Sequence, residues 1–506
     1  MGAARRGYLA VDLGASGGRV VAGLFDGRQM ALEEVHRFDN GPVPVAGHLH
    51  WDLLRLWQEV QDGLRSAAVR YGDQLRSVGV DTWGVDFGLL SRRDELLGNP
   101  FHYRDPRTQG LVDDVTRHVV SREEIFDYTG LQFMDINTLY QLVAMQRSGS
   151  VLLESADTFL MMPDIFHWLL TGQKVNELTN ATTTQFFNPR TGAWALELLQ
   201  RLGLPTHLFR EVTPPGTSLG PLRRDVAEAA GLKGVQVVLP GTHDTASAVM
   251  AVPARSGAQA DWCYISSGTW SLMGAEVPQP VITPLCRQYN FTNEGGVGGT
   301  TRLLKNIAGL WLIQECRRIW NLQGHHYSWD RLVEMAEHAE PLRSVIDPND
   351  SSFVAPADMP AAIADFCRRT GQPVPETEGA VVRCALESLA VCYRRVLGWL
   401  EELVGHRLNT IHIVGGGVQN RLLCQMAADA CGRPVVAGPV EATALGNVLM
   451  QAIACGDLPS IAAAREVVER SFPVERYEPG GGSPGTAGSQ LTERWAAAAQ
   501  RLWPNS

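Results

Sequence analysis

A polar triplet near the middle of the chain, His243, Asp244 and Thr245, follows an apolar run and precedes a run of small residues. Pro240-Gly241 is turn chemistry that ends the apolar run, so the triplet is expected at a strand end that faces a helix start. A carboxylate at the carboxyl end of a strand can accept a proton from a substrate hydroxyl. Asp244 or Thr245 could equally cap the helix, and the triplet alone leaves both interpretations open.

Three turns rich in glycine, serine or threonine follow apolar runs, at Gly14–Gly18, Gly268-Thr269 and Gly415–Gly417. The first two lie between strand-like runs, which predicts a hairpin near residues 8–25 and a second of similar shape near residues 262–274. Backbone N–H groups in such turns can cradle phosphate oxygens, because glycine lets the backbone approach closely. One such turn is usually only a tight hairpin, but three in two similar halves favour a nucleotide site.

The common nucleotide-binding motifs do not account for these turns. Only three lysines occur, at 174, 233 and 305, and none follows a glycine, so the chain has no Walker A sequence. The run Gly415–Gly417 has Asn420 where a dinucleotide fingerprint needs glycine, and it lies late in the chain. A Rossmann oxidoreductase is therefore not expected.

Asp12 stands beside the first turn, in the pattern Asp12-x-Gly14-x₄-Arg19. A carboxylate at this place could hold the water shell of Mg²⁺ on a polyphosphate, since hard cations prefer oxygen ligands. The alternative is a strand-end aspartate that satisfies the amides of the turn. The turns elsewhere in the chain favour the magnesium role.

Composition limits the candidate partners. The 506 residues are 45% hydrophobic and 19% charged with a net charge of -10, which describes a globular protein of at least two domains. No basic run stands out, so neither nucleic acid nor an anionic membrane is an expected partner. The nine cysteines are scattered and no secretory segment is apparent, so a cytoplasmic protein with reduced thiols is expected. A monomer or a homodimer is expected.

Hydrophobic periodicity predicts the elements that must position these groups. Residues 381–404 form the longest helical pattern, with Gly405 as its expected C-terminal cap. Residues 306–319 are predicted to form an amphipathic helix, which Asn306 could cap. A flexible linker is expected over residues 480–489, followed by a short terminal helix.

The order of these motifs resembles the FGGY carbohydrate kinases of the hexokinase/actin superfamily, from about Tyr8 to Ala454. The segments that carry the resemblance are Val11–Arg19, Asp81–Phe87, Thr179–Gln185, Gly241–Ala248, Ser266–Gly274, Leu304–Leu312 and Gly415–Gly417. It implies an α/β fold of two ribonuclease-H-like domains with a cleft between them. The expected boundaries are 1–249 for an N-terminal domain with the sugar site and the phosphate hairpin, 250–456 for a nucleotide-binding C-terminal domain, and 457–506 for a tail.

The resemblance also implies a role for each matching position. Asp244 would be the catalytic base for a sugar hydroxyl. The implied sugar contacts are Gly84, His243, Asp244, Thr245, Asn306 and Trp83. The implied ATP contacts are Ala15, Ser16, Gly17, Gly18, Arg19, Thr269, Gln314 and Gly416. Asp12 would hold the magnesium ion through water. Gly17 departs from relatives that often carry serine, which removes a hydroxyl donor but keeps the backbone amide.

Several of these residues have an ordinary structural alternative. His243 could be a core histidine with a backbone partner, and Trp83 could simply be part of the hydrophobic core.

Within the family the match is nearest to the kinases of L-rhamnulose, so the expected reaction is transfer of phosphate from ATP to the 1-hydroxyl of that sugar. The alternatives are a kinase for another ketose, such as fuculose or xylulose, or an actin-like ATPase switch.

Overall fold

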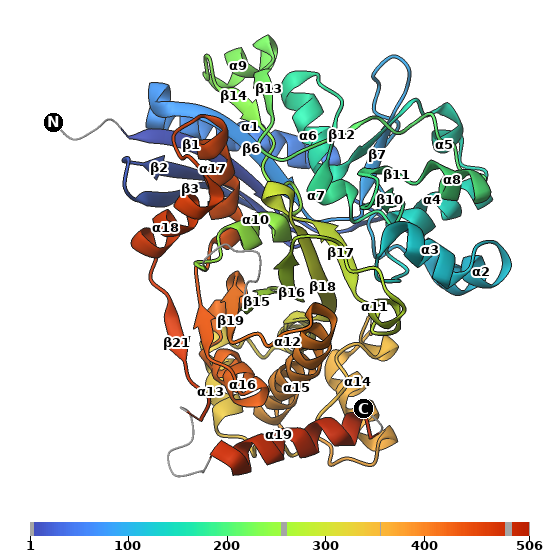
Figure 1. Ribbon diagram of the computed structural model, residues 1–506, viewed down its shortest axis with the longest axis vertical. Coiled ribbons are helices and arrows are strands. Elements are labelled where there is room, and N and C mark those ends of the chain that lie inside the picture. The colour runs from blue at the N-terminus through green and yellow to red at the C-terminus, as the bar shows by residue number, and fades with distance from the viewer. Residues whose placement is uncertain (1–4, 255–260, 355, 481–487, 505–506) are drawn as a thin grey trace. The chain divides into compact units, whose positions relative to one another are not determined.

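The computed structural model (Figure 1) describes residues 5–254, 261–354, 356–480 and 488–504. The chain divides into two compact units, each assembled from separate stretches. The first unit comprises Met1–Ala258, Glu276–Leu303 and Ala442–Ser471, and the second comprises Gln259–Ala275, Leu304–Glu441 and Phe472–Ser506. Because the units interleave along the chain, they do not test the continuous boundaries expected at residues 249 and 456, which stay a prediction.

A six-stranded mixed sheet forms the centre of the first unit. Its order is β13 (Ser218–Pro221), β14 (Gln236–Val238), β6 (Leu75–Thr82), β1 (Arg6–Leu13), β2 (Gly17–Phe25) and β3 (Met30–Asp39). β2 pairs antiparallel with both β1 and β3, whereas β6 pairs parallel with both β1 and β14. The predicted hairpin over residues 8–25 is confirmed by the pairing of β1 with β2.

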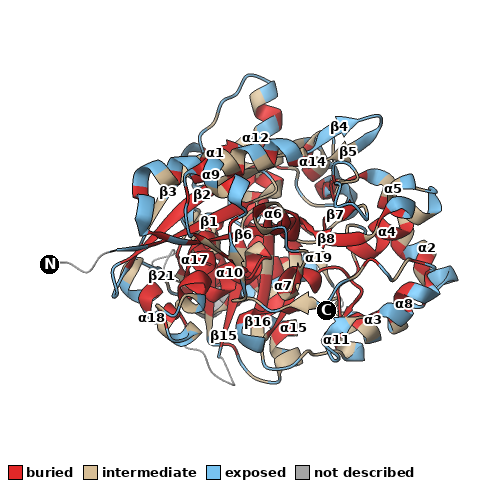
Figure 2. Ribbon diagram, turned by 90° about the horizontal axis from the view of Figure 1, so that it is seen from above, coloured by how far each residue is buried: buried red, intermediate tan, exposed pale blue. Residues whose placement is uncertain are grey.

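Helices cover both faces of this sheet, which explains why β1 and β6 are nearly continuous apolar runs. α1 (Leu53–Tyr71), α6 (Met162–Thr171) and α9 (Arg224–Ala230) contribute to the core on one face. α10 (Asp244–Met250) and α17 (Ala442–Ala454) contact the strands as well. Figure 2 shows β1 and β6 almost entirely buried.

The remaining elements of the first unit are short. The strands are β4 (Val43–Val45), β5 (His48–His50), β7 (Phe87–Leu90), β8 (Thr158–Met161), β9 (Asn176–Glu177), β10 (Phe187–Asn188), β11 (Ala193–Trp194), β12 (Val212–Thr213) and β17 (Thr292–Gly295). The helices are α2 (Leu111–His118), α3 (Arg122–Thr129), α4 (Thr138–Arg147), α5 (Val151–Ser155), α7 (Leu178–Ala181), α8 (Leu196–Arg201), α11 (Pro284–Gln288) and α18 (Ile461–Ser471).

A second mixed sheet contains the predicted hairpin near residues 262–274. Its order is β17, β18 (Thr301–Ala308), β16 (Trp270–Val277), β15 (Trp262–Ser267), β19 (Thr410–Val414), β20 (Val435–Ala437) and β21 (Glu475–Tyr477). β15 pairs antiparallel with β16 and parallel with β19, as β1 does with β2 and β6. The five strands β18-β16-β15-β19-β20 therefore repeat the order β3-β2-β1-β6-β14, and the α/β prediction with two similar halves is confirmed.

The helices of the second unit include the long helix expected from periodicity. They are α12 (Trp311–Leu322), α13 (Trp329–Glu337), α14 (Met359–Arg369), α15 (Glu378–Val404), α16 (Arg421–Cys431) and α19 (Gly488–Leu502). α15 ends as predicted at Gly405, whose φ of 78° is left-handed. The expected linker over 480–489 falls mostly on residues 481–487, outside the described residues, and the terminal helix begins at Gly488.

The predicted helix over residues 306–319 is wrong in its first part. β18 continues through Asn306 to Ala308, and α12 begins only at Trp311. The spacing of apolar residues in this segment fits a strand as well as a helix, and its first residues extend β18, which lies between β17 and β16 in the sheet. Asn306 is therefore not a helix cap.

Among the described residues, no helix is both long enough and apolar enough to cross a membrane.

Candidate active site

Asp244 is the first residue of α10, and His243 occupies the N-cap position. Asp244 Oδ1 accepts hydrogen bonds from its neighbour Thr245, at 2.6 Å from the backbone nitrogen and 3.1 Å from Oγ1. Neither Asp244 nor Thr245 is the N-cap, because both lie inside the helix; Asp244 instead accepts the backbone N–H of Thr245 within the first turn. The Asp244 side chain keeps about a third of its surface exposed, 33%.

The stretch before α10 is aligned with the end of β6. Thr82 donates its backbone N–H to the Thr242 carbonyl at 2.9 Å, and Thr82 forms a parallel bridge with His243. Asp12 on β1 and Asp81 on β6 are register partners. Three carboxylates therefore gather where parallel strands of the first unit end, as expected for a ligand site in an α/β sheet.

Electrostatics within this group act on the candidate base. Removal from water raises the pKa of Asp244; the neighbouring His243 acts in the opposite direction, and the carboxylate of Asp12 raises the pKa again. The net shift is upward, toward the range that suits a general base near neutral pH.

Asp81 is a buried carboxylate that the sequence analysis quoted only as part of a motif. Its Oδ2 accepts a hydrogen bond from Asn447 Nδ2 on α17 at 2.6 Å, and its Oδ1 has no partner among the described residues. Complete burial, and then the charge of Asp12, raise the pKa of Asp81 well above its usual range. A charged residue directly after the apolar run Val78-Gly79-Val80 was the signal that could have singled it out.

Asp12 is buried at the end of β1 and is held by Arg19. The Arg19 guanidinium donates to Asp12 Oδ2 from Nε at 3.0 Å and from Nη2 at 2.8 Å. No backbone amide of the turn donates to Asp12 within the described part of the chain, so the alternative role of satisfying turn amides is not observed. Arg19, expected at the phosphates, thus also balances the charge of Asp12.

The first glycine-rich turn is tight and partly open to solvent. Gly14 N donates to Gly17 O at 2.9 Å, Ser16 is exposed, and Ala15 and Gly17 are half-buried. Gly18 is buried, and a Cβ there would clash with the Phe38 ring. Gly18 is therefore needed for packing, whereas Ser16 is the exposed residue of the turn.

Glu177 holds Thr242 and His243 in place, and no sequence pattern indicated this role. Its Oε2 accepts from Thr242 N at 3.1 Å, from Thr242 Oγ1 at 2.6 Å and from Thr179 Oγ1 at 2.6 Å. Thr179 Oγ1 in turn lies 3.1 Å from the His243 backbone nitrogen, which donates to it. This fully buried carboxylate thus fixes the backbone immediately before Asp244.

Trp83 takes part in the hydrophobic core of the first unit. Its ring centroid lies 3.9 Å from that of Trp51, and its Nε1 donates to Asp86 Oδ2 at 3.0 Å. Asp86 also accepts from Trp51 Nε1 at 2.6 Å, and burial raises the pKa of Asp86 to about 6. These contacts match the core interpretation of Trp83, while its role in sugar binding stays a prediction.

Gly84, on the same turn as Trp83, is half-buried. A Cβ at this position would lie 3.0 Å from Thr183 Cγ2, so only glycine fits without movement of Thr183. Gly84 O also accepts the backbone N–H of Asp86 at 2.9 Å. The glycine keeps the turn compact close to the end of β6.

The ATP residues expected in the second unit come from three neighbouring segments. Thr269 O accepts from Gly309 N at 3.2 Å and from Trp311 N at 3.1 Å, which ties the β15–β16 turn to the start of α12, the helix of Gln314. A Cβ at Gly415 would lie 2.9 Å from Ser267 O, so the Gly415–Gly417 run lies against the end of β15. The structure therefore brings Thr269, the start of α12 and the segment of Gly416 together.

Asn306 is half-buried in β18 and belongs to the second unit. Trp83, Gly84 and the His243–Thr245 triplet belong to the first unit. A sugar pocket that combines Asn306 with these residues stays a prediction.

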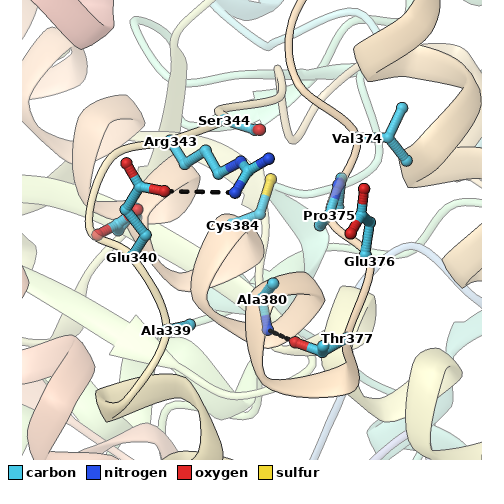
Figure 3. A pocket seen from close by; sticks show the side chains of 11 residues that line it. Ala339, Glu340, Arg343, Ser344, Val374, Pro375, Glu376, Thr377, Ala380 and Cys384 are labelled. Carbon is cyan, nitrogen blue, oxygen red and sulfur yellow. Dashed lines mark hydrogen bonds and ion pairs between the residues drawn. The ribbon is translucent and has the colours of Figure 1, made fainter.

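A separate pocket of about 180 Å³ lies in the second unit, beside α15 (Figure 3). Arg343 and Glu340 at its edge form an ion pair at 3.3 Å, and Thr377 caps α15 by accepting from Ala380 N at 3.2 Å. None of the residues expected to bind sugar or ATP lines this pocket. Its location therefore adds nothing to the assignment of the catalytic site.

Comparison with known proteins assigns the family. Residues 7–251 match the N-terminal domain, and residues 263–455 the C-terminal domain, of the FGGY family of carbohydrate kinases. The chain is 45% identical over 475 residues to a rhamnulokinase of Bacteroides thetaiotaomicron, covering 94% of this chain and 96% of that protein. The chain belongs to the FGGY family of carbohydrate kinases. A rhamnulokinase of Bacillus subtilis is 40% identical over 93% of this chain and 95% of its own.

Solved structures of FGGY kinases share the fold. The ligand-bound xylulose kinase from Lactobacillus acidophilus matches with a TM-score of 0.79 at 16% identity, covering 98% of this chain and 97% of that chain. Plasmodium falciparum glycerol kinase with ADP matches with a TM-score of 0.75 at 13% identity, covering 99% of this chain and 98% of that chain. These structures share the fold of this chain, while the matches to both family domains and to the rhamnulokinases confirm the expected family of carbohydrate kinases.

Proposed function

We propose that this FGGY kinase transfers the γ-phosphoryl group of ATP to the 1-hydroxyl of L-rhamnulose, giving L-rhamnulose 1-phosphate and ADP. The substrate is inferred from the rhamnulokinases of Bacteroides thetaiotaomicron and Bacillus subtilis, which align over nearly the whole chain. The observation that carries the chemistry is the carboxylate of Asp244, partly exposed at the start of α10 and close enough to Asp12 and Asp81 to interact with their charges.

The two oxygens of Asp244 are suited to different tasks. Oδ1 accepts both hydrogen bonds from Thr245, and no group among the described residues donates a hydrogen bond to Oδ2. Oδ2 is therefore the oxygen that would accept the proton of the sugar hydroxyl as that hydroxyl attacks phosphorus. Phosphoryl transfer asks for little more than this base, alignment of the reactants and neutralised charge.

The nucleotide would be bound by segments with accessible backbone. In the first turn Ala15, Ser16 and Gly17 would face phosphate oxygens, together with the buried Gly18 next to them and with Arg19 as the nearby cation. In the second unit Thr269 would contact phosphate, and Gln314 and Gly416 would lie on the nucleoside side. Their closeness within that unit supports the proposal.

The donor set of the first unit fits a magnesium ion that is held through water. Asp12 provides a carboxylate, and beside it the buried Oδ1 of Asp81 has no partner among the described residues. The described side chains contain no cluster of three His, Cys, Asp or Glu residues that could hold a metal directly. The ion would neutralise charge on the polyphosphate, and Asp12 would orient its water shell.

For the sugar, we propose contacts from Gly84, His243, Thr245 and Asn306, with Trp83 as an apolar neighbour. Hydroxyls paired with buried polar groups discriminate between sugars more strongly than shape alone. The proposed setting is the cytoplasm, where the nine cysteines, all free in this structure, would stay reduced.

A coupled ADP-release assay tests this function. Purified protein with ATP and Mg²⁺ would be offered L-rhamnulose, L-fuculose, L-xylulose, D-xylulose and glycerol in parallel. We expect the highest kcat/KM with L-rhamnulose, and phosphorus NMR of the product should show a phosphate ester at C1. A higher kcat/KM with another ketose would overturn the substrate, and ATP turnover that no sugar accelerates would overturn the kinase activity.

A further inference from the structure

A buried charged group lies behind His243, on the side away from Asp244. Arg302 on β18 is completely buried, and its Nε donates to the Gly295 carbonyl at 2.9 Å. Its Nη2 lies 3.1 Å from His243 Nδ1 and 3.2 Å from Glu294 Oε2. On the other side of the imidazole, His243 Nε2 lies 3.3 Å from Asp244 Oδ1.

The hydrogen-bonding capacities of these groups determine where the imidazole carries its proton. A guanidinium donates hydrogen bonds and cannot accept them, so the contact with Arg302 makes Nδ1 of His243 an acceptor. The ring proton then lies on Nε2, which faces Asp244 Oδ1. The N–H of Nε2 thus makes an electrostatic contact of 3.3 Å, without a hydrogen bond, to the oxygen that already accepts twice from Thr245.

Glu294 balances the charge of Arg302. Its Oε2 is 3.2 Å from Arg302 Nη2 and 3.2 Å from His243 Nδ1, but it makes no hydrogen bond of good geometry within the described part of the chain. Burial acts to raise the pKa of Glu294, whereas the charge of Arg302 acts to lower it, and the net pKa is lowered. An ionised Glu294 therefore compensates a guanidinium that would otherwise be buried alone.

We infer that Arg302 is a positioning residue for phosphoryl transfer, which acts through His243: it keeps the imidazole proton on Nε2, directed at Asp244 Oδ1, and so leaves Oδ2 to receive the substrate proton. This inference rests on the proposed function. Without Arg302 the imidazole can place its proton on Nδ1, toward Glu294. The lone pair of Nε2 would then face the carboxylate of Asp244 and repel it.

The sign of the effect on pH dependence follows from this geometry. The charged neighbours of Asp244 are Asp12 on β1 and Asp81 on β6. Those of His243 are Glu294 on β17 and Arg302 on β18. Glu177 contacts the preceding residue, Thr242. A polar N–H on Nε2, 3.3 Å from Oδ1, favours the ionised form of Asp244. Its loss therefore raises the pKa of Asp244, and the acid limb of the kcat profile moves to higher pH.

The test uses a double variant, because Arg302→Met alone would leave Glu294 buried without a partner. In Arg302→Met/Glu294→Gln we expect kcat with L-rhamnulose to fall roughly tenfold to hundredfold, less than on loss of the base itself. KM for ATP should stay unchanged, and the acid limb should move to higher pH. Arg302→Lys keeps a charged donor and should restore the acid limb toward that of the wild type.

The chain offers a matched control in the same unit. Arg465 and Glu276 form another buried ion pair, at 2.6 Å, that does not involve His243 or Asp244. Arg465→Met/Glu276→Gln should lower the thermal unfolding midpoint but leave the acid limb where it is. An equal movement of the acid limb in this control would show a general effect of destabilisation and overturn the inference.

A measurement that needs no turnover examines His243 directly. In ¹⁵N NMR spectra of histidine-labelled protein, with the signals of His243 assigned from the His243→Gln variant, we expect a protonated Nε2 and an unprotonated Nδ1. The double variant should lose this preference. A proton on Nδ1 in the wild type, or an unchanged acid limb in the double variant, would overturn the inference. Inactivity of the wild type on every sugar would instead overturn the proposed function, and the NMR result would stand.

Discussion

The carboxylate of Asp244 is asymmetric, and its neighbours create the asymmetry. Thr245 donates twice to Oδ1, and His243 Nε2 lies 3.3 Å from the same oxygen. Asp12 acts on the group through its charge and contributes to the raised pKa. One oxygen is therefore occupied in orienting the group, and the other remains able to accept a proton.

Replacing Asp244 by asparagine removes the proposed base while keeping the size of the side chain. We expect kcat to fall roughly 10²- to 10⁴-fold, because an amide cannot take the hydroxyl proton. ATP affinity measured by calorimetry should change little. Asp225→Asn, at an exposed carboxylate on α9, is the control and should leave kcat unaffected. Turnover near the wild-type value in Asp244→Asn would assign the base role to another group.

The wild-type enzyme should show the matching pH dependence. The base works only when it is ionised, so kcat falls as the pH is lowered through the raised pKa of Asp244. The acid limb should therefore lie above pH 4, the region about which an ordinary aspartate titrates. An acid limb at or below that region would contradict the raised pKa.

At the scale of elements, the three glycines of the short segment Gly415–Gly417 have different roles. Gly415 has a φ of 87°, and a Cβ there would lie 2.9 Å from Ser267 O. A Cβ at Gly417 would clash with the Ser267 side chain, whereas one at Gly416 would meet no atom within 4 Å. Gly415 and Gly417 hold the segment against β15, and Gly416 leaves open space where the nucleoside is proposed to bind.

Gly416→Val should weaken ATP binding without unfolding the protein. We expect Kd for ATP to rise roughly tenfold or more, about 1.4 kcal/mol, because the valine side chain would fill space proposed for the nucleoside. Calorimetric affinity for L-rhamnulose and the thermal midpoint should stay near wild type. Gly417→Val is the structural counterpart and should lower the thermal midpoint. Unchanged ATP affinity in Gly416→Val would remove Gly416 from the site.

At the scale of the whole molecule, a late segment of the chain completes the first unit. α17 carries Asn447, which donates to Asp81, and Gln451, whose Nε2 donates to the Leu9 carbonyl at 2.9 Å. Ser77 Oγ donates to Gln451 Oε1 at 2.7 Å. The strands that carry Asp12 and Asp81 are therefore braced by residues more than 360 positions away in sequence.

The close packing of α17 on α10 can be tested with two Gly→Ala variants. A Cβ at Gly446 would clash with the Ser247 carbonyl, so Gly446→Ala should lower the free energy of unfolding by about 1–3 kcal/mol. Gly398 lies in the middle of α15 with nothing near its Cβ position, so Gly398→Ala should raise that free energy by about 0.5–1 kcal/mol. Urea unfolding of both variants measures the difference. Equal stability of the two would contradict the tight α10–α17 contact.

Local patterns were sufficient for much of the fold. The two hairpins and the length and end of α15 follow from turn residues, a capping residue and helical spacing, all of which act over a few residues. The motif order also pointed to the family that the comparisons then confirmed. The boundary between β18 and α12 was predicted wrongly, because pairing with a distant strand outweighed the local period.

Long-range contacts set the chemical properties of the site. The sequence placed His243, Asp244 and Thr245 side by side, but it contained no sign that Arg302 lies behind the imidazole, because the partners are 59 residues apart. Likewise Asp81 became a candidate only when its unpartnered oxygen was seen beside Asp12. Residue types and spacing determine which groups can do chemistry, whereas burial and the neighbours brought by folding decide which oxygen of Asp244 is free to accept a proton.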